Sequence, residues 1–143
     1  MSVATSRAVF EDIIDLINSG QIEQAIGLCQ KSLQKFPRDV NVLGLLGAIY
    51  LKQNRHAEAE TTLRQTIALA PSFAKPQEDL GILLLDLDRP EEAIPLLETA
   101  ARLDPRSENA HFNLGKALAA LGRGQEADVA FEASFELSPT RKL

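Results

Sequence analysis

The sequence predicts an all-α protein, a right-handed α-solenoid built from four stacked helix-turn-helix repeats. Two series of residues support this prediction, because the members of each recur at a constant interval of 34 residues. The interval separates the prolines Pro37, Pro71, Pro105 and Pro139 and the alanines Ala25, Ala59, Ala93 and Ala127. A repeat of this length can hold one pair of helices, which cannot bury its own apolar stripe, so neighbouring copies must stack.

Each repeat is predicted to hold two helices joined by a short turn. In the second copy, apolar residues recur at helical spacing from Leu43 to Leu51 and again from Ala59 to Ala70. The copies cover residues 6–39, 40–73, 74–107 and 108–141, so residues 1–143 are predicted to form a single array. The predicted turns hold residue types that tolerate a left-handed backbone, namely Gly20, Asn54, Asp88 and Gly122.

Glycines recur on the first helix of three copies, at Gly47, Gly81 and Gly115. A glycine inside a helix costs roughly 1 kcal/mol, so close packing should explain the recurrence. We expect these glycines to face the recurring alanines of the second helix. The first copy has Ile13 at the glycine position, so we expect its two helices to lie further apart.

The repeated landmarks resemble the signature of the tetratricopeptide repeat (TPR) family, whose period is also 34 residues. The matching residues are Leu46, Gly47, Tyr50, Ala59 and Pro71, with Leu80, Gly81, Ala93, Ala100 and Pro105. The resemblance covers nearly the whole chain. It departs from the family at the usual tryptophan, whose place is taken by Val9, Leu43, Gln77 and His111.

The resemblance implies a protein-interaction scaffold whose first helices line a concave groove that binds a peptide or helix of a partner. Residues at the matching positions are Phe10, Ile14, Asn41, Gly44, Lys75, Glu78, Ile82, Asn109, Phe112 and Lys116. The apolar members would serve as anchors, and the two asparagine amides would suit a peptide backbone. For Phe10, packing against an adjacent first helix is an equal alternative.

One known use of such grooves is not expected here. TPR proteins that hold the C-terminal carboxylate of chaperones use a set of Lys, Asn and Arg side chains. The matching positions of the first two copies hold Phe10, Ile14, Gly44 and Ala48, which cannot bind a carboxylate.

Composition narrows the remaining functions. Twenty acidic and fifteen basic residues give a net charge of −5, which argues against binding nucleic acid or anionic membranes through charge. The first residues contain neither a signal peptide nor a membrane span, so a cytoplasmic protein is expected. The single cysteine, Cys29, excludes an internal disulfide, and with only two histidines no metal or cofactor site is predicted.

No enzyme is predicted from these residues. Cys29 falls at the position of Leu63, Leu97 and Phe131 in the other copies, so it should be a buried structural residue. His56 should be exposed, and neither histidine has a catalytic partner in the sequence. An alternative is that the chain is the regulatory or assembly arm of a larger enzyme. The stretch FAKPQEDLG is similar to TPR arms that precede sulfotransferase-like domains, and catalysis would then lie outside this chain.

Two further features of the sequence lead to expectations about its surface. The third copy concentrates carboxylates at Glu78, Asp79, Asp86, Asp88, Glu91 and Glu92, which are expected to form a solvated face. The last helix carries Phe131, Phe135 and Leu137, which its own first helix cannot all cover. We therefore expect self-association as a homodimer through this helix, or a longer natural protein.

Overall fold

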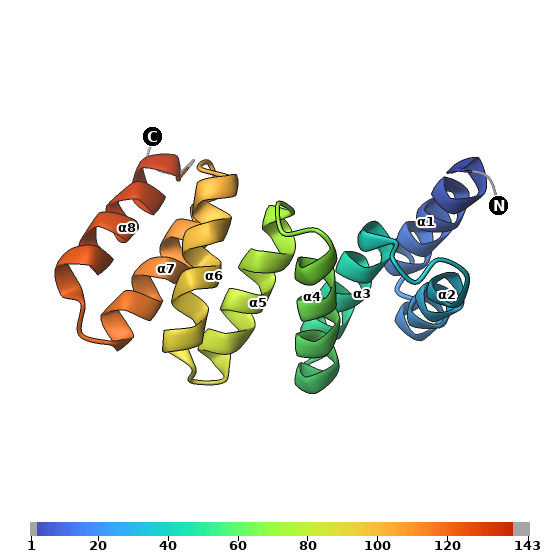
Figure 1. Ribbon diagram of the computed structural model, residues 1–143, viewed down its shortest axis with the longest axis horizontal. Helices are drawn as coiled ribbons and strands as arrows, with labels where there is room; N and C mark the ends of the chain where they lie inside the picture. Colours follow the sequence, from blue (N-terminus) through green and yellow to red (C-terminus); the bar gives the residue numbers. More distant parts are fainter. Residues whose placement is uncertain (1–2, 139–143) are drawn as a thin grey trace. The chain divides into compact units, whose positions relative to one another are not determined.

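The computed structural model describes residues 3–138, and side chains from residue 7 onward. Within this part of the chain it contains eight α-helices in four consecutive pairs, which confirms the predicted all-α fold (Figure 1). The helices are α1 (Val3–Asn18), α2 (Ile22–Lys35), α3 (Val40–Lys52), α4 (His56–Leu69), α5 (Ala74–Asp86), α6 (Pro90–Leu103), α7 (Glu108–Ala120) and α8 (Gly124–Leu137).

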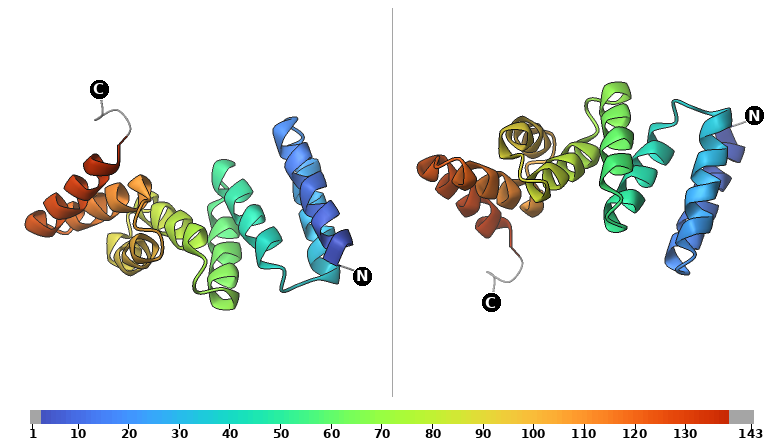
Figure 2. Two further views of the ribbon diagram at one scale, coloured as in Figure 1. Left: turned by 90° about the horizontal axis from the view of Figure 1, so that it is seen from above. Right: turned by 90° about the horizontal axis from the view of Figure 1, so that it is seen from below.

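The chain divides into two compact units, Met1–Ala70 and Pro71–Leu143. The N-terminal unit contains α1 to α4 and the C-terminal unit contains α5 to α8, so each unit holds two repeats. Within each unit, the two helices of a repeat run antiparallel, as the views in Figure 2 show. In the C-terminal unit the two first helices, α5 and α7, also contact each other directly.

The predicted turn and stop signals are confirmed. The four turn residues all have positive φ angles: Gly20 (79°), Asn54 (57°), Asp88 (59°) and Gly122 (73°). The helices α2, α4 and α6 each end two residues before the proline of their repeat, because proline cannot continue a helix. The fourth proline, Pro139, lies outside the described residues.

The recurring glycines make room for a different residue than predicted. A β-carbon on each would meet the large side chain that lies four residues after the recurring alanine, so the expected glycine–alanine pairing is wrong. The close pairs are Gly47 with Leu63 (2.8 Å), Gly81 with Leu97 (2.6 Å) and Gly115 with Phe131 (2.7 Å). The period places a small residue on one helix opposite a large residue on the other. The alanines themselves are buried.

The first repeat reverses this arrangement. Ile13 stands at the glycine position and Cys29 at the position of the large residue, and both are completely buried. In this repeat the larger side chain of the pair is therefore on the first helix, and the smaller one is on the second. The helices α1 and α2 contact each other less extensively than α3 and α4 do. This agrees with the expectation that the two helices of the first repeat, which lacks the glycine, lie further apart.

Cys29 is a structural residue, as predicted. Burial raises the pKa of its thiol from 9.0 to about 11, so the thiol remains protonated at neutral pH. A neutral, buried cysteine behaves as a small apolar side chain and is a poor nucleophile.

Candidate functional site

The first helices of the C-terminal unit carry six of the residues implied by the family resemblance. Lys75, Glu78 and Ile82 lie on α5, and Asn109, Phe112 and Lys116 lie one period later on α7. Because α5 and α7 contact each other, these residues belong to two neighbouring helices. We call the exposed and half-buried members the inner-helix face, which consists of Lys75, Ile82, Asn109, Phe112 and Lys116.

Phe112 is the most prominent apolar residue of this face, with 48% of its surface exposed. Its ring lies 5.6 Å, centroid to centroid, from the ring of Phe131 on α8, at an interplanar angle of 58°. The ammonium of Lys116 lies 5.8 Å from the centre of the Phe112 ring. The ring is thus held by an aromatic contact and a cation–π contact, while about half of its surface remains accessible to a partner.

Glu78 is placed differently from the rest of the set. It is buried, and Ser107 Oγ donates a hydrogen bond of 3.1 Å to Glu78 Oε2. Ser107 also caps α7, since its hydroxyl accepts a hydrogen bond from the Ala110 amide. Glu78 therefore joins the two repeats of the C-terminal unit.

The expectation of a solvated acidic face is wrong for two of its six members. Glu78 and Asp79 are both buried, whereas Asp86, Asp88, Glu91 and Glu92 are exposed. Lys75 Nζ lies 3.2 Å from Asp79 Oδ1 and 3.9 Å from Glu78 Oε1. Burial works to lower the pKa of Lys75, but the two carboxylates outweigh it and leave that pKa above its ordinary value.

In the N-terminal unit, four further residues of the predicted set lie on α1 and α3. Phe10 and Ile14 are half-buried on α1, and Gly44 is half-buried on α3. Asn41 is exposed in the first turn of α3, where its backbone amide donates to the capping carboxylate of Asp39 at 3.1 Å. These residues form a second, smaller set in their own unit.

The positions that replace the family's tryptophan have a structural role in the C-terminal unit. Gln77 Nε2 donates to the carbonyl of Pro71 at 3.0 Å, and His111 Nε2 lies 3.0 Å from the carbonyl of Pro105. Each of these contacts spans six residues and ties a first helix to the loop that precedes it. His111 is therefore explained as part of the framework.

The structure contains a groove that the sequence did not predict. It lies in the C-terminal unit between α6 and α8, has α7 as its floor and encloses about 410 Å³. Apolar residues supply most of its lining, including Ala101, Leu114, Leu118, Val129 and Ala133, and we call it the outer groove. The small residue Ala101 is the sequence signal that could have indicated the open space.

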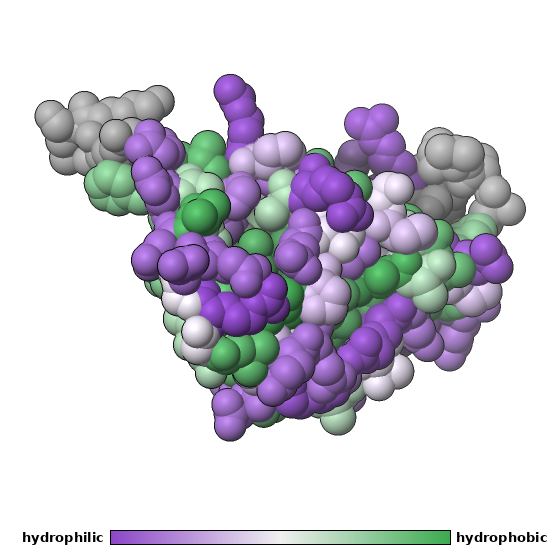
Figure 3. Space-filling model, turned by 60° about the vertical axis from the view of Figure 1, so that its left-hand side comes forward, coloured by the Kyte–Doolittle hydropathy of each residue, from purple (hydrophilic) through white to green (hydrophobic). Residues whose placement is uncertain are grey.

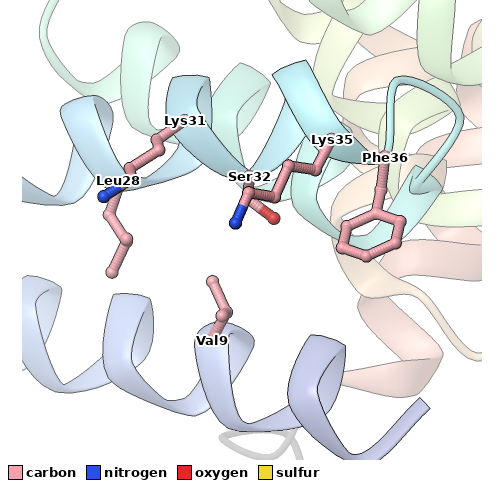
Figure 4. Close-up of a pocket in the computed structure, with 6 residues that line it drawn as sticks. All are labelled: Val9, Leu28, Lys31, Ser32, Lys35 and Phe36. Atoms are coloured by element: carbon pink, nitrogen blue, oxygen red, sulfur yellow. The ribbon is translucent and has the colours of Figure 1, made fainter. Parts of the chain in front are cut away.

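A second cavity, the edge pocket, lies between α1 and α2 in the N-terminal unit (Figure 4). It encloses about 190 Å³ and is lined by Val9, Leu28, Lys31, Ser32, Lys35 and Phe36. Figure 4 shows Val9 and Leu28 pointing toward one another from opposite helices. Val9, which lines this pocket, stands at the position where the family usually has the much larger tryptophan.

The three residues predicted for self-association have different surroundings. Phe131 is half-buried between Gly115 and the Phe112 ring, so it is used inside the C-terminal unit. Phe135 is 59% exposed on α8, and Leu137 is half-buried near the end of that helix.

The described residues carry neither a metal centre nor a membrane span. No group of three or more His, Cys, Asp or Glu residues within this part of the chain is arranged to hold a metal ion. No helix found there is long and apolar enough to cross a membrane. Figure 3 shows hydrophilic residues over much of one face of the molecule, with apolar patches between them.

His56 differs from its predicted exposure. It is half-buried at the start of α4, and its Nδ1 atom is buried without a hydrogen-bond partner among the described residues.

Comparison with known proteins agrees with this architecture. Two family models described as tetratricopeptide repeat match residues 16–77 and 78–139. Together they cover most of the chain, which belongs to the tetratricopeptide repeat family. Domains of this family typically mediate protein–protein interactions. No curated protein sequence matches the chain.

Solved structures with the same fold include MamA and YrrB. One MamA structure superposes with a TM-score of 0.85 at 24% sequence identity, and covers 94% of this chain and 74% of its own. A second has a TM-score of 0.82 at 25% identity, with 87% and 73% covered. YrrB, described as a TPR protein with an unusual peptide-binding site, has a TM-score of 0.83 at 24% identity, with 92% and 68% covered.

Proposed function

We propose that this chain is a protein-interaction module that binds a peptide or helical segment of a partner on its inner-helix face. The observation that carries the proposal is Phe112, a large aromatic side chain that is both half exposed and held in place. Rigid aromatic residues are frequent anchors in protein interfaces, because they bury a large area and lose little conformational freedom on binding. The peptide-binding site described for YrrB, a protein of the same fold, agrees with this kind of ligand.

The neighbours of Phe112 indicate the character of the ligand. Ile82 offers a second apolar contact, and Asn109 offers an amide that can both donate to and accept from a peptide backbone. Lys75 and Lys116 are exposed cations on the same face, although Lys75 is already partly neutralised by Asp79. A segment with one large apolar side chain and nearby carboxylates fits this combination best.

The proposal can be tested before the natural partner is identified. A displayed peptide library is selected against the wild-type protein, and the affinity of a selected peptide is then measured for purified variants. Phe112→Ala should weaken binding at least tenfold, the loss that corresponds to about 1.4 kcal/mol. Asn109→Ala preserves the Phe112–Phe131 contact and should weaken binding by a smaller factor.

Val129→Ala is the matched control, because Val129 is 71% exposed but lines the outer groove. It should leave the affinity unchanged. If Phe112→Ala binds as the wild type does and Val129→Ala loses binding, the ligand occupies the outer groove and the proposal is wrong. Circular dichroism of each variant establishes that the fold is retained.

A further inference from the structure

We propose that the outer face of α8 docks into the edge pocket of a second copy of this chain, so that copies associate head to tail. The outer groove, inside the C-terminal unit, provides the template for this contact. There, Glu98 and Ala101 on α6 line the groove together with residues of the following repeat. The groove thus shows how the second helix of one repeat faces the repeat that comes next.

The 34-residue period transfers this arrangement to the two ends of the chain. One period after Glu98 and Ala101 come Glu132 and Phe135 on α8. The outer groove is also lined by His111 on its floor and by Ala130 and Ala133 on its opposite wall. Three periods before these residues are Val9, Leu28 and Lys31. These last three residues line the edge pocket. A second copy stacked in the same register therefore places Phe135 over the edge pocket.

The sizes of the residues support this occupant. In the outer groove, the small side chain of Ala101 leaves a large volume open. Phe135, at the equivalent position of α8, is much larger and is 59% exposed. The edge pocket offers it apolar contacts from Val9, Leu28 and Phe36. A large, mostly exposed aromatic side chain thus matches a cavity that a small valine has left open.

Charge supports the same pairing. Residues 124–138 contain four acidic residues, Glu126, Asp128, Glu132 and Glu136, and no basic residue. The edge pocket instead carries Lys31 and Lys35. The transferred register brings Glu132 beside Lys31, so the contact is attractive. A symmetric dimer of two α8 helices would place like charges opposite one another, which disfavours it.

The proposed contact is heterologous, since a helix of one copy meets a pocket of another. Every pair then retains one α8 face and one pocket that are not yet occupied, so assembly continues into a ring or an open chain. The mass measured by sedimentation should therefore rise with protein concentration above the 15.6 kDa of one chain. A wild-type protein that stays at this mass throughout the micromolar range overturns the proposal.

Two variants test the two partners of this contact one at a time: the outer face of α8, which is the tail, and the edge pocket, which is the head. Phe135→Asp removes the tail, and Val9→Trp fills the pocket with the residue that is usual for the family. Each variant alone should sediment as a monomer. An equimolar mixture should form a heterodimer and nothing larger, because only the α8 of the Val9→Trp protein and the pocket of the Phe135→Asp protein remain intact.

Matched controls make the result specific. Val129→Asp places the same charge on an exposed apolar residue of the same helix, but at the outer groove, and should assemble as the wild type does. Lys31→Glu should prevent assembly and Glu132→Lys should do the same, whereas the protein that carries both changes should regain it. If Val9→Trp assembles normally while Phe135→Asp does not, the contact is symmetric and the edge pocket is not its acceptor. The helix content of each variant is measured by circular dichroism.

Discussion

The two units of this chain join their repeats at different places. In the N-terminal unit the connection runs from α2 to the end of α3, where Gln30 Nε2 donates to the Tyr50 hydroxyl at 3.2 Å. In the C-terminal unit it runs between the first helices, where Ser107 donates to Glu78. The same repeat therefore allows the polar contact to lie on either side of the helix pair.

The difference follows from single residues at equivalent positions. The counterparts of Gln30 and Tyr50 two periods later are Glu98 and Leu118, which cannot form the same hydrogen bond. The counterpart of Glu78 two periods earlier is Phe10, which has no hydrogen-bonding group in its side chain. Each unit thus lacks the residues for the other unit's connection.

The position of the connection affects which surface remains open. In the C-terminal unit, the side without the hydrogen bond is the apolar outer groove of about 410 Å³. The equivalent cavity of the N-terminal unit encloses about 290 Å³ and is lined by Tyr50, Ala57, Glu58, Thr61 and Thr62. It is smaller and more polar, and the Arg55 guanidinium lies above the Tyr50 ring at 4.7 Å. In the C-terminal unit, the hydrogen bond between the repeats lies on the side of the first helices, and the apolar groove lies on the other side.

The largest expected effect comes from transferring the reversed packing of the first repeat into the third. Gly81→Ile should destabilise the C-terminal unit by about 1–3 kcal/mol, because its β-carbon would lie 2.6 Å from Leu97 Cγ. Adding Leu97→Cys recreates the Ile13–Cys29 combination and should recover most of the loss. Urea unfolding followed by circular dichroism measures both. An unchanged midpoint for Gly81→Ile would contradict the packing.

A glycine in the N-terminal unit provides the opposite control. Gly27 lies inside α2, and apart from its two neighbours and the nearby backbone of that helix no atom lies within 4 Å of the position of an added β-carbon. Gly27→Ala should therefore stabilise the N-terminal unit by up to roughly 1 kcal/mol, from helix propensity alone. The chain's single tyrosine, Tyr50, lies in that unit, so its fluorescence should follow this change and not the change at Gly81.

The pH dependence of stability also distinguishes the units, because only the N-terminal unit contains a cysteine. Burial raises the pKa of Cys29 from 9.0 to about 11, so between these values the unfolded chain releases a proton that the folded chain retains. The contribution is constant below about pH 9, and stability is lost as the pH rises toward 11. Cys29→Ala should remove this part of the slope in urea unfolding followed by circular dichroism. An identical slope in both proteins would show that the thiol titrates in the fold.

Removing the two hydrogen bonds that connect the repeats should lower stability by less than Gly81→Ile does, and by different amounts in the two units. Ser107→Ala removes both a helix cap and the hydrogen bond to buried Glu78, so about 1–2 kcal/mol is expected. Tyr50→Phe removes only the bond from Gln30, for which about 0.5–1 kcal/mol is expected. Urea midpoints compare the two. A larger loss for Tyr50→Phe would reverse the proposed importance of the connections.

The fold could be predicted from the sequence because its determinants are local and repeat. Proline, turn glycine and apolar spacing act within a few residues of one another, and each copy repeats the same signals. The glycine partners Leu63, Leu97 and Phe131 could not be predicted in the same way, because the sequence pattern does not show which residue of the second helix lies opposite each glycine. To predict whether the alanine or the residue one turn later lies opposite the glycine, one must know how the second helix is rotated against the first. The periodicity of the sequence does not give this rotation.

The candidate site was less predictable for a related reason. Buried Glu78 accepts a hydrogen bond from Ser107, which lies 29 residues further along the chain, directly before the first helix of the next repeat. The edge pocket is lined by the small Val9 of α1 together with residues of α2, so it depends on which side chains of the two helices lie opposite one another. Charge and hydropathy along the chain cannot reveal such contacts, although comparing equivalent positions between repeats does indicate where they differ.

The smallest expected effect concerns an ion pair that three repeats share. Arg55, Arg89 and Arg123 each bind the glutamate three residues later at the start of a second helix. Arg55 also approaches Glu23 at 3.7 Å and covers the Tyr50 ring, whereas for Arg123 the contacts are with Glu126. Arg55→Gln should therefore lower the urea midpoint slightly more than Arg123→Gln, and both changes should be small because the pairs are exposed.

The dependence of stability on salt and on pH distinguishes the charge interaction of these arginines from the contact of Arg55 with the Tyr50 ring. The hydrogen bonds from Arg55 and Arg123 hold the pKa of Glu58 and of Glu126 below its ordinary value. Each pair therefore stabilises the fold above the ordinary pKa of glutamate, and this stabilisation is lost as the pH falls through the lowered value. High salt should reduce most of the cost of Arg123→Gln, because the exposed ion pair with Glu126 is screened by salt. It should leave part of the cost of Arg55→Gln, because the guanidinium also packs on the Tyr50 ring. Equal costs for the two variants in high salt would show that the ring contact contributes nothing.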